Sequence, residues 1–202
     1  PHTSSRRQRQ MCIRDRSIME HAERVHGAQE IVSVTRDNPR HRYTYADSFA
    51  RVRQLANAMD GWGLNQSDRI ATLAWNDYRH FESYYASACS GYVCHTINPR
   101  LFPEQIVYII NHAEDQYVFL DPDFWPLIEQ VAPQCSGVKG WVVMTTAEHM
   151  PDTSVANVHC YEELLVGQAD TYTWPAIHEN DACALCYTSG TTGNPKGVMY
   201  SH

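Results

Sequence analysis

The chain has 202 residues and a formal net charge of −7, with 43% hydrophobic and 19% charged residues. This composition is typical of a globular protein with enough apolar residues for a core, and it excludes disorder over most of the length. No apolar run approaches the roughly 18–20 residues that cross a bilayer, and no apolar signal segment follows the basic start. We therefore expect a soluble, cytoplasmic protein with no transmembrane segment.

Helical and strand-like segments alternate from residue 17 onward. Helical spacing of apolar residues, cap residues and terminal glycines predict helices over 17–27, 47–63, 76–91, 103–113, 123–135 and 160–168. Apolar or β-branched runs predict strands or extended pieces over 30–35, 42–47, 68–75, 92–98, 116–121, 140–146 and 181–187. Strands separated by helices favour an α/β fold, with a mostly parallel sheet flanked by helices on both faces.

The charge is unevenly distributed along the chain. Residues 1–16 hold five of the 16 basic and one of the 23 acidic side chains, which leaves 11 basic and 22 acidic in residues 17–202. The acidic body argues against nucleic acid as a partner. A basic head can bind nucleic acid or a membrane, but "MCIRDR" resembles translated sequencing-adapter sequence. We therefore treat residues 1–16 as a non-native or disordered head and expect one folded unit over 17–202.

The seven cysteines show no regular spacing, so we expect reduced thiols, several of them buried. Cys183 and Cys186 form a Cys-x-x-Cys pair, but a zinc site would need a second pair at suitable spacing. Residues three apart in a strand point to opposite faces, so we interpret this pair as part of a core strand. The eleven histidines form no HExxH pattern, and the sequence predicts no metal site.

Some single residues have two interpretations. Asn76 is the expected N-cap of the third helix. In that helix His80 and Glu82 could act as a catalytic acid and base, but packing with a polar edge is favoured. Arg100 follows an Asn-Pro turn, and we interpret it as a structural ion-pair partner.

A loop rich in Gly, Ser and Thr follows the last predicted strand: "TSGTTGNPKG", residues 188–197. Its hydroxyls can donate hydrogen bonds to phosphate oxygens, its glycines let the backbone approach an anion, and Lys196 brings a positive charge. The carboxyl end of a parallel strand is where open α/β sheets bind ligands. The alternative is a polar surface loop with no ligand. The kinase-type P-loop and the GxGxxG dinucleotide pattern are both absent.

The order of residues in this loop points to a family. "YTSGTTGNPKGV" resembles the signature loop of the AMP-forming adenylating enzymes, which include acyl-CoA synthetases, luciferases and peptide-synthetase adenylation domains. "WNDYRHFESYYA" and "HTINPRLFPEQIVYIINHAED" resemble the medium- and long-chain fatty-acyl-CoA synthetases and the methylmercaptopropionate-CoA ligases. The resemblance covers residues 17–202. It implies the amino-terminal part of the AMP-binding (adenylation) domain, truncated just after the phosphate loop.

The resemblance also implies a reaction in two steps. A carboxylic acid, expected to be a fatty acid, attacks Mg²⁺-bound ATP to form an acyl-adenylate and pyrophosphate, and coenzyme A then displaces AMP. By resemblance Lys196 and Thr191 are the catalytic residues. The residues implied in binding and shaping the site for the ATP phosphates are Thr188, Ser189, Gly190, Thr191, Thr192, Gly193, Lys196 and Gly197. Related synthetases can dimerise, so a homodimer is also an expectation.

The family's other catalytic elements lie beyond His202 in family order: a Glu for Mg²⁺, an Asp for ribose, a hinge and a C-terminal Lys. We therefore expect the 202-residue chain to be inactive alone and prone to aggregate. Two alternatives stay open: a short non-catalytic nucleotide-binding or scaffolding protein, and an adenylating enzyme whose acceptor is not coenzyme A. The residues present do not identify the acyl chain.

Overall fold

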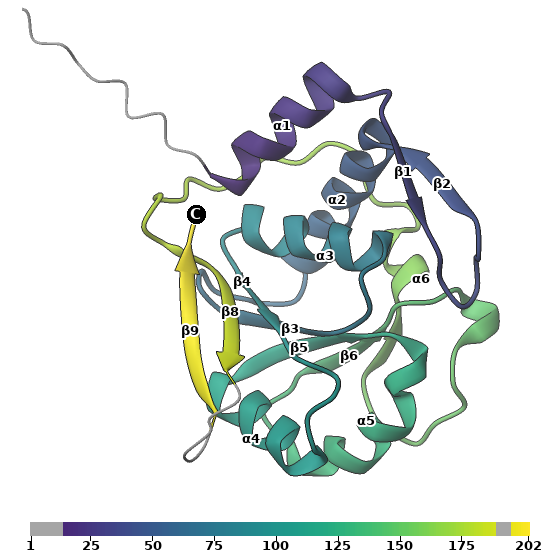
Figure 1. Ribbon diagram of the computed structural model, residues 1–202, viewed down its shortest axis with the longest axis vertical. Helices are drawn as coiled ribbons and strands as arrows, with labels where there is room; N and C mark the ends of the chain where they lie inside the picture. Colours follow the sequence, from purple (N-terminus) through teal and green to yellow (C-terminus); the bar gives the residue numbers. More distant parts are fainter. Residues whose placement is uncertain (1–13, 189–194) are drawn as a thin grey trace, which may run out of the picture.

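A seven-stranded sheet forms the centre of the fold in the computed structural model, which describes residues 14–188 and 195–202 (Figure 1). The strands stand in the order β7-β6-β5-β3-β4-β8-β9, and every neighbouring pair is parallel except β8 and β9. Their bounds are β3 (Arg69–Leu73), β4 (Val93–Thr96), β5 (Asp115–Leu120), β6 (Gly140–Val143), β7 (Val158–Cys160), β8 (Ala182–Thr188) and β9 (Lys196–Ser201). The predicted mostly parallel sheet is confirmed.

Helices cover both faces of this sheet (Figure 1). One face carries α1 (Asp15–His26), α2 (Tyr45–Asp60), α3 (Tyr78–Cys89) and α6 (Tyr161–Leu165). The other face carries α4 (Pro103–Ala113) and α5 (Trp125–Val131). Short 3-10 turns lie at η1 (Pro122–Phe124), η2 (Ala132–Gln134) and η3 (Ala147–His149). The layers are those expected for an α/β fold with an open sheet.

The alternation of side chains along the central strands divides the core into two layers. Ile70 and Phe119 pack with α2 and α3, whereas Ala71 and Val118, one residue away in each strand, pack with α4 and α5. Because successive residues of a strand point to opposite faces, a strand covered on both sides must be apolar throughout. This explains the continuous apolar runs in the sequence.

Strands β1 (Glu30–Ser33) and β2 (His41–Thr44) form a separate antiparallel hairpin. They do not join the main sheet; the strand expected over 30–35 and the extended piece expected over 42–47 pair with each other instead. Seven residues separate them, too few for the crossover that a parallel pair needs. The Tyr43 hydroxyl donates to Glu82 Oε1 at 2.9 Å, which ties the hairpin to α3.

The N-cap of α3 is Asp77, not the predicted Asn76. The Asp77 side chain accepts a hydrogen bond from the His80 backbone N–H at 3.0 Å. A carboxylate at this position also interacts favourably with the positive end of the helix dipole, which an amide does not.

Two strands and one helix start were not predicted. β7 has only three residues, and β9 follows the Gly-rich loop and contains Gly197, so neither gives a strong strand signal in the sequence. Helix α1 begins at Asp15, so it includes the last two residues of the segment 1–16 that was predicted to be non-native or disordered. Residues 1–13 lie outside the described residues.

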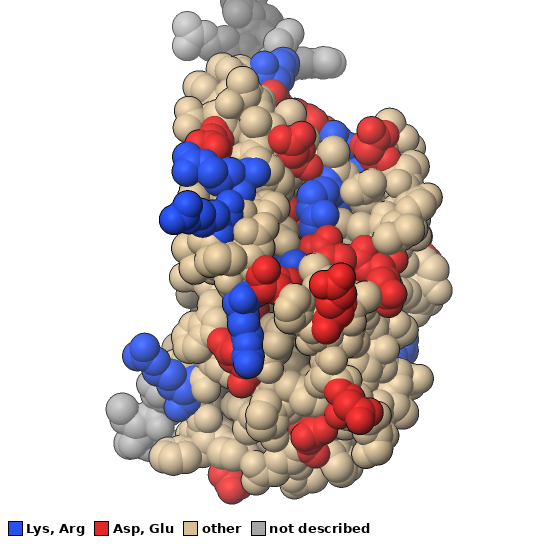
Figure 2. Space-filling view, turned by 90° about the vertical axis from the view of Figure 1, so that its right-hand side faces the viewer, with Lys and Arg blue, Asp and Glu red and all other residues tan. Residues whose placement is uncertain are grey.

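The face that carries β1, β2, α5 and α6 is shown in Figure 2. Acidic side chains lie across its middle, and basic side chains form separate groups beside them. The expectation that nucleic acid is not a partner stays a prediction. Among the helices of the described ranges, none has the length and apolarity required to cross a membrane.

Candidate functional site

The predicted phosphate loop joins two paired strands. β8 and β9 are antiparallel neighbours, with Thr188 opposite Lys196 and Tyr187 opposite Gly197. The Thr188 hydroxyl lies 3.4 Å from the Lys196 carbonyl oxygen and donates to it. The loop therefore starts and ends at adjacent positions, which fixes the separation of its two ends. Both end residues are exposed.

Five of the predicted site residues lie in residues 189–194, outside the described part of the structure: Ser189, Gly190, Thr191, Thr192 and Gly193. Their assignment to phosphate binding stays a prediction. The three described site residues, Thr188, Lys196 and Gly197, are brought together by the hairpin.

The hairpin opens at the carboxyl edge of the parallel sheet. β8 is parallel to β4, so its end at Thr188 lies at the same edge as the ends of β3 and β4. A hollow of about 570 Å³ lies at this edge, lined by Trp75 and Asn76 after β3, Asn98 and Arg100 after β4, and Tyr187 of β8. The two described ends of the predicted loop, Thr188 and Lys196, lie at this carboxyl edge, where open sheets bind ligands.

Gly197 is required by a close approach between the two strands. A Cβ atom at this position would lie 3.1 Å from Leu185 Cδ1 and 3.2 Å from Tyr187 Cζ. Both distances are shorter than ordinary van der Waals contact, so a larger residue would require the Leu185 and Tyr187 side chains to shift by a few tenths of an ångström. The predicted loop-shaping role of Gly197 thus has a steric basis on β9, immediately after Lys196.

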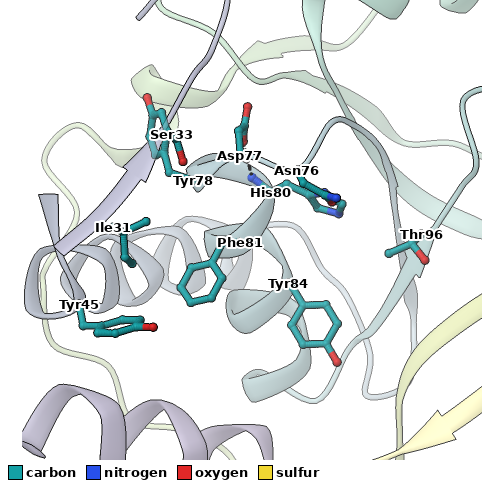
Figure 3. Close-up of a pocket in the computed structure, with 10 residues that line it drawn as sticks. All are labelled: Ile31, Ser33, Tyr45, Asn76, Asp77, Tyr78, His80, Phe81, Tyr84 and Thr96. Carbon is teal, nitrogen blue, oxygen red and sulfur yellow. Dashed lines mark hydrogen bonds between the residues drawn. The ribbon is translucent and has the colours of Figure 1, made fainter. Parts of the chain in front are cut away.

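A second cavity of about 400 Å³ lies between β1 and α3 (Figure 3). The rings of Phe81 and Tyr84 line it from α3, and Tyr45 lines it from α2, while Ile31 belongs to β1. Three residues line both this cavity and the hollow at the sheet edge: Asn76, His80 and Thr96. An aromatic cavity therefore adjoins the polar edge where the predicted phosphate loop begins.

Both ring nitrogens of His80 have hydrogen-bond partners in the fold. Its Nδ1 atom lies 3.1 Å from the Trp75 carbonyl oxygen and must donate to it, so Nε2 accepts from the Thr72 hydroxyl at 3.0 Å. Burial lowers the pKa of His80, which favours this neutral ring. The favoured interpretation of His80 as a packed polar residue agrees with these contacts.

Glu82 is also committed to structural contacts. It is fully buried and accepts hydrogen bonds from Tyr43, from Arg51 at 2.8 Å and from Tyr161 at 2.7 Å. Burial raises the pKa of Glu82, and the Arg51 guanidinium acts against this shift. Both oxygens are occupied by neighbours, so Glu82 offers no acceptor to a ligand.

The ion pair expected for Arg100 is not formed with any described residue. Its backbone N–H donates to Asn98 Oδ1 at 3.0 Å, and its side chain lines the hollow at the sheet edge. The Asn98 side chain therefore accepts a backbone hydrogen bond within the Asn-Pro-Arg segment, which forms an Asx turn.

Asp121 follows β5 at the same edge of the sheet. Burial, together with the nearby carboxylates of Asp77 and Asp123, raises the pKa of Asp121 to about 7, although the Trp75 N–H donates to it. Sequence reasoning did not single out this carboxyl. Its position directly after an apolar strand is the signal that marks it as buried.

The two cysteines of the Cys-x-x-Cys pair lie on β8, as expected for a strand. Cys183 is buried, whereas Cys186 lies 3.1 Å from the Thr96 hydroxyl oxygen across the β4–β8 pair. Asp15, Cys183 and His202 lie close together, a cluster that the sequence did not predict. The Asp15 carboxylate is paired with His202 Nδ1 at 2.8 Å, so we interpret the cluster as a hydrogen-bonded pair beside a thiol.

Comparison with known proteins gives a family match over almost the whole chain. The profile described as AMP-binding enzyme matches residues 19–202. The medium-chain-fatty-acid–CoA ligase of Ectopseudomonas oleovorans is 50% identical over 186 residues, which cover 92% of this chain and 34% of that protein.

Two further relatives align with the same share of this chain. The 3-methylmercaptopropionyl-CoA ligase of Ruegeria lacuscaerulensis is 47% identical and the long-chain-fatty-acid–CoA ligase of Thermus thermophilus is 42% identical; the alignments cover 92% of this chain and 34% and 32% of those proteins. The chain thus spans about a third of the length of the relatives that it matches.

Solved structures share the fold. The anthranilate CoA ligase AuaEII, solved with anthranoyl-AMP, has a TM-score of 0.81 at 22% identity, over 94% of this chain and 35% of that one. A fatty acyl CoA synthetase of Mycobacterium tuberculosis has a TM-score of 0.74 at 23% identity, over 93% and 34%. The sheet and its helices correspond to one part of these longer chains.

Proposed function

Because the chain belongs to the AMP-binding enzyme family, we propose that it is the amino-terminal part of an AMP-forming acyl-CoA ligase. The parent enzyme activates a carboxylic acid with ATP and transfers the acyl group to coenzyme A. The observation that carries the proposal is the loop 188–197, held by a β-hairpin at the carboxyl edge of a parallel sheet.

The described residues fit the phosphates of ATP. Lys196 is exposed at one end of the loop and forms no ion pair with a described carboxylate, so its ammonium is available to an anion. The exposed Thr188 stands opposite it and adds a hydroxyl. Fixed donors of this kind stabilise charge that develops on a leaving pyrophosphate.

Mg²⁺ bound with ATP supplies neutralising charge and brings the acid and phosphorus together. We assign none of the described residues as a Mg²⁺ ligand. The role of this chain is to hold the phosphates: Lys196 neutralises charge, Gly197 lets the strands approach, and the Thr188 hydroxyl donates to a phosphate in place of the Lys196 carbonyl oxygen. Ser189, Thr191 and Thr192 are proposed to complete the set of hydroxyls, with Gly190 and Gly193 shaping the loop.

The proposed substrate is a fatty acid or a related carboxylic acid. This rests on the names of the relatives, which act on medium-chain fatty acids, long-chain fatty acids and 3-methylmercaptopropionate. A cytoplasmic location and a homodimer remain predictions.

The first test is to read the coding DNA past His202 and assay the longer product. We expect pyrophosphate exchange that depends on both ATP and a fatty acid, and acyl-CoA formation after coenzyme A is added. Exchange without acyl-CoA would indicate another acceptor. A stop codon after His202, with ATP binding but no exchange, would overturn the catalytic proposal and leave a nucleotide-binding protein.

A further inference from the structure

Tyr187, the residue before the proposed phosphate loop, is bound to a helix on one face of the sheet. Its hydroxyl oxygen lies 2.6 Å from Nδ1 of His112, in the last turn of α4. The two rings meet edge to face, with centroids 5.9 Å apart. The contact joins residues 75 positions apart in the sequence, so it ties the end of β8 to a different layer of the fold.

The Tyr187 ring also lies beside the buried pair formed by His95 and Asp115. Its centroid lies 5.2 Å from that of His95 on β4. His95 Nδ1 lies 2.8 and 2.9 Å from the two carboxylate oxygens of Asp115, and both side chains are fully buried. His95 therefore has a fixed ring orientation, and it offers a rigid surface to Tyr187.

The third contact of Tyr187 is with β9. Gly197 stands opposite Tyr187, and the ring lies so close that a Cβ atom on Gly197 would be 3.2 Å from Cζ. The next pair along the ladder is Thr188 and Lys196, the two ends of the loop. The position of the Tyr187 ring thus sets how β9 lies against β8 one residue away from Lys196.

β9 is held by an antiparallel ladder to β8 from Ala182 to Thr188, and the residue that follows it, His202, pairs with Asp15. It is an edge strand, and all six of its residues are exposed. Edge strands with exposed side chains open at lower free energy than buried strands. Near the loop, the side-chain contacts of Tyr187 with His112 and His95 add to this backbone ladder.

We propose that Tyr187 and His112 form an anchor that positions Lys196 and Thr188 for phosphate binding. They are positioning residues, because neither needs to touch the nucleotide. This inference rests on the proposed function, which makes the loop an ATP-phosphate site.

The anchor is tested with four single variants and the double variant Tyr187→Phe/His112→Leu, all made in the longer product of the coding DNA. Tyr187→Phe and His112→Leu remove the hydrogen bond from either side. His112→Asn keeps a polar atom near the position of Nδ1 and is the conservative rescue. Tyr172→Phe is the matched control, because it removes the 2.7 Å hydrogen bond of another tyrosine hydroxyl, to Asp60 at the end of α2.

Hydrogen–deuterium exchange reports the anchor without any ligand. We expect faster exchange in peptides of β8 and β9 for Tyr187→Phe and His112→Leu, with the central strands unchanged. His112→Asn and Tyr172→Phe should leave the hairpin as in the unmodified chain. Unchanged exchange in both bond-deleting variants would overturn the inference.

Calorimetric titration with ATP and with inorganic tripolyphosphate connects the anchor to binding. Loss of one hydrogen bond corresponds to an affinity about two- to ten-fold weaker, and the double variant should be no worse than the worse single one. Unchanged affinity in the variants, with binding by the unmodified chain, overturns the inference and leaves the proposed function standing. No binding by the unmodified chain overturns the proposed phosphate role and the inference together, while the exchange data still show whether the hydrogen bond holds the hairpin.

Discussion

Lys196 is one of only two lysines in the sequence, and this gives its proposed role a clean test. We expect Lys196→Ala to weaken ATP binding by about ten-fold or more, because a charge-assisted contact to phosphate is lost. The melting temperature should change little, since the side chain is exposed. Calorimetry and thermal unfolding measure the two effects.

Lys139→Ala is the matched control, because Lys139 is also exposed and lies in the turn before β6, away from the loop. Equal loss of ATP affinity in both variants would mean that net charge, and not the loop, governs binding.

Asp121 gives a prediction about pH. Its pKa is about 7 in the folded chain, against 3.8 for an aspartate in water, so the folded state holds the proton more tightly. Stability from this group is therefore fully present below about pH 4 and is lost as the pH rises through 7. We expect Asp121→Asn to be more stable than the unmodified chain at pH 8, and the gap to close toward pH 4.

One pKa unit corresponds to about 1.4 kcal/mol, so the gap at pH 8 is a few kcal/mol at most. Urea unfolding at pH 5, 6, 7 and 8 measures it. Parallel pH profiles for the two proteins would show that Asp121 does not titrate abnormally.

Among the elements of the fold, the β8–β9 hairpin carries the described residues of the proposed phosphate site. Gly197→Ala should destabilise the hairpin by about 1 kcal/mol or more and weaken ATP binding, because the added Cβ meets Leu185 and Tyr187. Gly137→Ala is the control, since nothing lies within 4 Å of a Cβ at that turn. Chemical denaturation measures the stability of the two variants, and calorimetry measures their ATP affinity. Equal stability and equal affinity in the two variants would argue against the close approach at Gly197.

Most of the helices and strands could be predicted from local sequence patterns. The helix with Pro103 at its first turn ends at Ala113 as predicted, because its start and its apolar spacing are both encoded locally. β9 was missed because Lys196 and Gly197 read as loop residues, and only "VMY" suggests a strand. The hydrogen bond between Tyr187 and His112 could not be predicted, since it depends on how α4 packs on the finished sheet.

At the scale of the whole molecule, a network of buried charges joins several elements. Glu82 of α3 binds Arg51 of α2, and Glu162 of α6 binds both Arg51 and Arg79. Arg79 also binds Asp37, in the turn of the β1–β2 hairpin. Because the partners are distant in sequence, neither composition nor periodicity could reveal the network. Sequence patterns predict the parallel sheet but not its strand order, because the order depends on which segments distant in the sequence pair with each other.

We expect Glu82→Ala to reduce the free energy of unfolding by about 3 kcal/mol, because it removes the buried acceptor of two tyrosine hydroxyls and one of the two carboxylates that pair with Arg51. Glu30→Ala is the control, since it breaks the exposed pair with Arg42 and should change the free energy of unfolding far less. Urea denaturation of both variants measures the difference. Equal costs would mean that the network is not effectively buried.

The strand order has a consequence for how the chain is made. Each strand of the main sheet after β3 pairs with at least one strand that precedes it: β4 and β5 with β3, β6 with β5, β7 with β6, β8 with β4, and β9 with β8. A nascent chain leaving the ribosome can therefore add each strand to a surface that already exists. The hairpin that carries Lys196 arrives after the other strands described in this sheet, so a codon change that slows translation before Ala182 gives the acceptor edge time to form.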